Sequence, residues 1–179
     1  MAKSGVSPAV YAVAALGALA VMGGIGYMFM QIDPPEAPAP VVPLTPMQLA
    51  AAADAAPADP AAWARLCAAT AKNFWRESSP ADCDRAVELG ADAVQPRLDR
   101  AFLNLKIGMP DKAFEGLEDV LAKQPREPRA LFGRALITIQ RGDLAGSAPD
   151  RRAAIAANPN VVTELEAAYD FKVPPEYRS

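Results

Sequence analysis

Residues 95–125 read QPRLDRAFLNLKIGMPDKAFEGLEDVLAKQP and carry the start and stop signals of a helical hairpin. The first segment runs from Gln95 to Gly108, and glycine is the usual residue just past a helix end. The second runs from Pro110 to Lys123, because proline is favoured in a first helical turn, and Pro125 closes it. The stretch therefore predicts two helices joined by a short turn.

The same signals recur 34 residues further along the chain. The recurring pairs are Arg100 and Arg134, Ala101 and Ala135, Gly108 and Gly142, Val120 and Ala154, and Pro125 and Pro159. A period of 34 residues built from two helices is typical of tetratricopeptide repeats. The chain resembles that family over residues 60–161, which implies an all-α solenoid of three hairpins, 60–93, 94–127 and 128–161.

The three units match the family pattern to different degrees. The matching residues are Ala101, Ala113, Leu117, Val120 and Pro125 in the second unit, Leu131, Ala135, Gly142, Ala154 and Pro159 in the third, and Trp63, Leu66, Cys67 and Ala86 in the first. The first unit lacks the interhelical glycine and the final proline. In the third, Gly146 and Pro149 predict a second helix that starts late, near Ser147, and is short. Apolar residues at helical spacing from Val161 to Lys172 predict a capping helix, within a final segment 162–179.

After a short tail, residues 1–7, the segment Pro8–Ile32 contains no charged residue and predicts a membrane-spanning helix. A buried core helix would show a polar stripe, and a signal peptide would have a shorter apolar region. Lys3 precedes the segment and acidic residues follow it, which favours a cytoplasmic N-terminus. The Ala20/Gly24 spacing would let another membrane helix approach, although small residues are also common in such helices.

Residues 33–46, DPPEAPAPVVPLTP, predict an extended proline-rich spacer, with a plain disordered linker as the alternative. Residues 47–59 follow as a short alanine-rich helix and linker, with Thr45 as its cap and Pro46 in its first turn.

The resemblance implies that the first helices of the units line a concave face that binds a peptide or a partner helix. The predicted groove residues are Leu98, Phe102, Leu105, Lys106, Arg129, Phe132, Leu136, Ile139 and Gln140. This largely apolar set suits a hydrophobic peptide or an amphipathic helix. The alternative is that the same side chains are core, covered by the C-terminal helix or by residues 47–56.

Four arginines on or near these helices, Arg97, Arg100, Arg129 and Arg134, have two interpretations. They could clamp a carboxylate by bidentate hydrogen bonds. Alternatively, they form a solvated basic face paired with acidic neighbours such as Asp99 and Glu127.

The chain contains two cysteines, Cys67 and Cys83, at positions that touch in the tetratricopeptide family. An oxidising compartment would make a disulfide natural. Two buried free thiols or a redox-active pair are the alternatives, and no C-x-x-C motif supports the latter.

The chain has no histidine, a net charge of −3 and no phosphate-binding motif. These features predict a protein that is not an enzyme, has no cofactor or metal and does not bind nucleic acid. By resemblance, we expect a scaffold in the bacterial inner membrane with a periplasmic domain, serving envelope assembly or cytochrome c maturation. The alternative is a small accessory subunit of a membrane complex, held mainly by its transmembrane helix.

Overall fold

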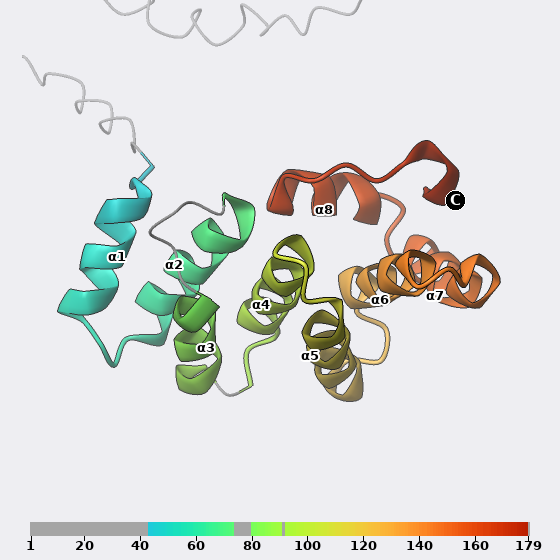
Figure 1. Ribbon diagram of the computed structural model, residues 1–179. Coiled ribbons are helices and arrows are strands. Elements are labelled where there is room, and N and C mark those ends of the chain that lie inside the picture. Colours follow the sequence, from blue (N-terminus) through green and yellow to red (C-terminus); the bar gives the residue numbers. More distant parts are fainter. Residues whose placement is uncertain (1–42, 74–79, 91, 179) are drawn as a thin grey trace, which may run out of the picture. The chain divides into compact units, whose positions relative to one another are not determined.

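A computed structural model describes residues 43–73, 80–90 and 92–178 (Figure 1). Proline begins most of the helices, since it loses no hydrogen bond in a first turn. The helices are α1 (Pro46–Ala55), α2 (Pro60–Lys72), α3 (Pro80–Leu89), α4 (Val94–Lys106), α5 (Pro110–Lys123), α6 (Pro128–Gln140), α7 (Leu144–Ala157) and α8 (Val161–Tyr169), with a 3-10 turn at Pro175–Tyr177. The described residues contain no strand, so the all-α prediction is confirmed.

Gly108 and Gly142, which are 34 residues apart, end α4 and α6 in the same way. Their φ angles are +78° and +89°, a conformation that glycine adopts without strain. In each case the glycine N–H and the N–H that follows it bond to carbonyls of the last helical turn, at 3.3 and 2.8 Å after α4 and at 2.8 and 3.1 Å after α6. This is the Schellman pattern. The recurrence in the sequence therefore marks a recurrence in the backbone.

The helices pack as successive hairpins, α2 with α3, α4 with α5 and α6 with α7. The first helices also contact one another, α2 with α4 and α4 with α6. Residues at equivalent positions touch across these contacts. Arg129 Nη1 donates to Gln95 Oε1 at 2.6 Å, and Lys106 Nζ donates to the Lys72 carbonyl at 2.7 Å, each pair being 34 residues apart.

Small residues let the helices approach closely. A Cβ atom at Gly133 of α6 would lie 2.8 Å from Phe102 Cζ of α4 and 3.0 Å from Leu117 Cδ1 of α5. Gly133 therefore has to be glycine for α6 to pack on this hairpin. The repeat pattern did not predict this requirement.

Two predicted helix ends are wrong. Helix α7 begins at Leu144 rather than near Ser147, because the Asp143 side chain caps it by accepting from the Gly146 N–H at 2.7 Å. Pro149 lies inside the helix and gives up one backbone bond there. Helix α8 ends at Tyr169 rather than Lys172, because Asp170 adopts a left-handed conformation with φ 50°.

The first hairpin is joined by a disulfide between Cys67 of α2 and Cys83 of α3, with their Cα atoms 4.6 Å apart. Both residues are fully buried. Preceding this hairpin, α1 packs on α2 and is capped by Thr45, whose hydroxyl accepts from the Gln48 N–H at 3.3 Å. The bond closes a loop in the unit that has neither the Gly108-type turn nor a final proline.

Within the described residues, no helix combines the length and apolar character needed to cross a bilayer. The predicted tail 1–7, the membrane span 8–32 and the spacer up to residue 42 lie outside those residues.

Candidate binding site

Helix α8 covers part of the face formed by the first helices, contacting both α2 and α6. Its last residue, Tyr169, stacks on Phe102 of α4 with ring centroids 4.3 Å apart, and both side chains are about 1% exposed. Such stacking adds specific geometry to the burial of apolar area. The chain itself therefore occupies this part of the predicted groove.

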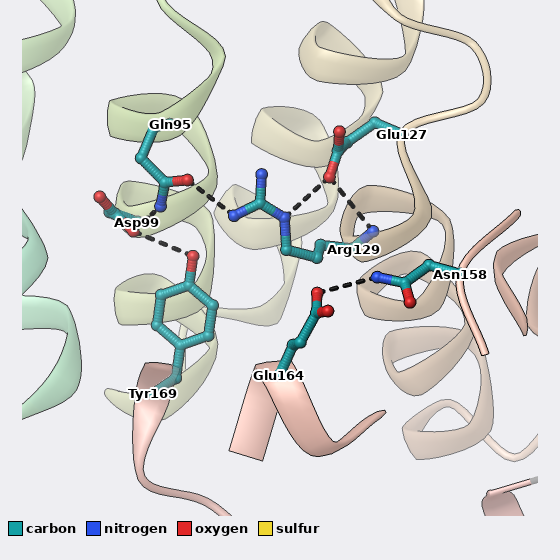
Figure 2. A network of polar contacts seen from close by, with 7 residues as sticks. All are labelled: Gln95, Asp99, Glu127, Arg129, Asn158, Glu164 and Tyr169. Atoms are coloured by element: carbon teal, nitrogen blue, oxygen red, sulfur yellow. Dashed lines mark hydrogen bonds and ion pairs between the residues drawn. The ribbon is translucent and has the colours of Figure 1, made fainter. Parts of the chain in front are cut away.

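A polar network fixes α8 to α4 and reaches α6 (Figure 2). The Tyr169 hydroxyl donates to Asp99 Oδ1 at 2.9 Å, and Gln95 Nε2 donates to the same oxygen at 2.7 Å. Arg129 then links Gln95 to Glu127 through bonds of 2.6 and 2.8 Å. Because the members come from three helices, the network sets the position of α8 relative to α4 and α6.

Asp99 is a buried carboxyl with one unsatisfied oxygen. It is 2% exposed, and its Oδ2 has no hydrogen-bond partner. Burial raises the pKa of Asp99 from 3.8 to about 6, although the bonds from Tyr169 and Gln95 and the charge of Arg129 lower it. Burial and the neighbouring Asp99 also raise the pKa of Tyr169 well above its usual range. The network is therefore built around a carboxyl that is costly to ionise.

One helical turn further along, the same face opens into a cavity of about 490 Å³, which we call the groove cavity. Its lining residues are Phe102, Leu105, Lys106, Leu136, Ile139, Gln140, Phe171, Lys172, Val173, Pro174 and Tyr177. The first six belong to α4 and α6 and are six of the nine predicted groove residues. The other five belong to the segment after α8.

The remaining three predicted groove residues lie elsewhere. Leu98 and Phe132 are fully buried in the core. Arg129 belongs to the polar network, where its guanidinium bonds to Gln95 and Glu127. The structure thus gives these three residues intramolecular contacts in place of the groove-lining positions expected of them.

Residues 170–178, which we call the C-terminal segment, form the second wall of the groove cavity. Val173 is 2% exposed, and its N–H donates to Glu166 Oε1 at 2.8 Å. Arg178 pairs with the same carboxylate and donates to the Val173 carbonyl at 3.0 Å. Phe171 stacks towards Phe102 with ring centroids 6.1 Å apart. The sequence did not predict this wall, because no periodicity marks the residues after Tyr169.

Lys106 joins the groove cavity to the first hairpin. Its ammonium donates to the carbonyls of Ala71 and Lys72, at 3.2 and 2.7 Å, near the end of α2. Cations are favourable at that end of a helix. Burial lowers the pKa of Lys106, although the charge of Asp170 raises it.

The arginines considered as a carboxylate clamp bond to groups of the chain itself. Arg134 makes a bidentate contact with Asp150, at 2.7 and 2.9 Å, and Arg100 bonds to Asp84 at 3.3 Å. Arg97 donates to the Ala93 carbonyl at 2.8 Å. With Arg129 in the polar network, the structure agrees with the interpretation of paired surface charges.

The described residues contain no cluster of three or more metal-ligating side chains. The groove cavity combines an apolar floor with two ammonium groups and one amide, an arrangement suited to binding. Comparison with models of known protein families finds no match for this chain, and no curated protein matches it. The geometry of the site alone therefore supports a function.

Proposed function

We propose that the protein is a membrane-anchored, tetratricopeptide-like scaffold that binds an apolar segment of a partner protein in the groove cavity. One observation carries the proposal: six predicted groove positions on α4 and α6 line a cavity of about 490 Å³. That volume lies within the range of about 300–1,000 Å³ typical of ligand sites. Residues 8–32 would supply the anchor, which raises the local concentration of the domain at the membrane.

The 34-residue recurrence and the matching glycine turns support the family assignment within this proposal. The buried disulfide supports a domain in an oxidising space, such as the periplasm of a bacterium. Envelope assembly and cytochrome c maturation are processes in which such an anchored scaffold would act.

Gentle solubilisation of the full chain, followed by identification of co-purifying proteins, tests this function. Leu136→Glu would place a charge in the groove cavity, and Leu144→Glu provides a matched control because Leu144 is 51% exposed on α7. We expect the first variant to lose a partner that the second retains, with equal helical content by circular dichroism. Retention of every partner by a folded Leu136→Glu variant would contradict the proposal.

The accessory-subunit alternative requires a second variant. Replacing residues 8–32 by an unrelated membrane helix should leave partner binding intact if the groove cavity is the main contact. Loss of the partner in that chimera would instead assign the main contact to the membrane helix.

A further inference from the structure

The charges lining the groove cavity all have the same sign. Lys106, from α4, and Lys172, from the C-terminal segment, are its charged lining residues, and no carboxylate lines it. The rest of the lining is apolar or aromatic apart from Gln140. A ligand that fits this lining carries apolar groups together with a negative charge.

The ammonium of Lys106 has capacity for such a charge. It has three N–H donors, and the carbonyls of Ala71 and Lys72 accept two of the bonds it makes. Because it is partly desolvated, a nearby anion would stabilise its charged form. Asp170 acts on it electrostatically but does not line the groove cavity. Lys172 is exposed, so its ammonium is available to the same anion.

The surroundings limit the form of the ligand. Helix α8 already occupies the adjoining part of the face, where Tyr169 covers Phe102. The C-terminal segment, held to Glu166 through Val173 and Arg178, closes the other side. A helix about 10–12 Å across would need the space that α8 and this segment fill. An extended chain that inserts one or two side chains does not.

We propose that the groove cavity recognises an extended segment of the partner in which an apolar side chain is followed or preceded by an acidic residue. The apolar side chain packs on Phe102, Leu136 and Ile139, and the carboxylate is held by Lys106 and Lys172. This inference rests on the proposed function and names the chemistry of its partner.

Two dyes with nearly the same ring system test the charge and the cavity separately. Anilinonaphthalene sulfonate is apolar with one negative charge, and phenylnaphthylamine lacks that charge. Both are titrated by fluorescence into the folded domain and into Lys172→Met, with Lys123→Met as the control. Lys123 is 44% exposed and pairs with Asp92, outside the groove cavity.

We expect Lys172→Met to weaken binding of the sulfonate about three- to ten-fold, as for one partly exposed ion pair, and to leave phenylnaphthylamine unchanged. Lys123→Met should change neither. Equal effects of Lys172→Met on both dyes, or none on either, would overturn the charge recognition while leaving the apolar site in place. If Leu136→Glu leaves phenylnaphthylamine binding unchanged, the groove cavity is not an apolar site, and the proposed function itself fails.

Discussion

Helices α4 and α6 present different surfaces at their two ends. At the N-terminal end, Asp99, Gln95 and Arg129 form a polar network that binds Tyr169, and α8 fills the face. At the C-terminal end, Leu136 and Ile139 line a hollow of about 490 Å³. The two surfaces are one or two helical turns apart on the same helices.

The difference follows from which groups each end exposes. A buried carboxyl needs hydrogen-bond donors, and the chain supplies them from its own C-terminal helix. An apolar surface has no such specific requirement, so the C-terminal segment borders it without filling it. The repeat therefore keeps one end of the face for its own stability and leaves the other available for a ligand.

Phe102→Ala should have the largest effect, because Phe102 belongs to both ends. Its ring stacks on Tyr169 and lines the groove cavity. We expect a loss of about 3–5 kcal/mol in the free energy of unfolding, measured with urea, together with weaker binding of phenylnaphthylamine. Phe114→Ala on α5 is the control, since that ring is half-buried under Arg141 and should lose less. Equal losses in the two variants would refute a shared role for Phe102.

Asp99→Asn should change the pH dependence of stability at the polar end. The folded protein holds this proton more tightly than the unfolded chain, because burial raises the pKa of Asp99 from 3.8 to about 6. The contribution is therefore present below pH 3.8 and is lost as the pH rises through 6. We expect the unfolding free energy of the wild type to fall by about 3 kcal/mol relative to the variant across that window. A difference that stays constant with pH would show that Asp99 is not perturbed.

Tyr169→Phe should remove the hydroxyl while keeping the aromatic stack. Asp99 Oδ1 would retain only the bond from Gln95, so we expect a loss of about 1.5 kcal/mol in unfolding free energy. Tyr177→Phe is the matched control at the apolar end, where Tyr177 lines the groove cavity. It should be nearly neutral. A neutral Tyr169→Phe variant would mean that the hydroxyl does not hold α8.

Arg178→Ala should have the smallest effect on global stability and a clear local one. Its side chain is 40% exposed, so losing the pair with Glu166 should change the unfolding free energy by less than about 1 kcal/mol. The Val173 amide, which bonds to Glu166, should exchange with solvent about ten-fold faster by NMR as the C-terminal segment loosens. Amides inside α4 should not change. Unchanged exchange at Val173 would show that Arg178 does not hold the wall.

Features with a local cause were predictable from the sequence. The Thr45 cap, the prolines that begin helices and the turns at Gly108 and Gly142 each depend on neighbours in the chain. The six positions lining the groove cavity follow from the 34-residue register, which places equivalent residues on one face.

Features that depend on tertiary partners were not predictable. The start of α7 depends on Asp143 and Gly146, which form a cap only in one side-chain conformation. The bond between Tyr169 and Asp99 joins residues 70 positions apart, and no local pattern marks it. The path of the C-terminal segment depends on a left-handed Asp170 and on the Glu166–Arg178 pair. These three features decide how much of the face stays open.

Helix α8 also limits how many hairpins this architecture can hold. It touches both α2 and α6, the first helices of the first and third hairpins. With 9 residues it is about 14 Å long, close to the two spacings of about 8–10 Å each that separate α2 from α6 across α4. A fourth hairpin inserted between them would place the outer two beyond its reach. The length of this one helix therefore acts as a molecular ruler, and lengthening the array would require lengthening α8 by about six residues.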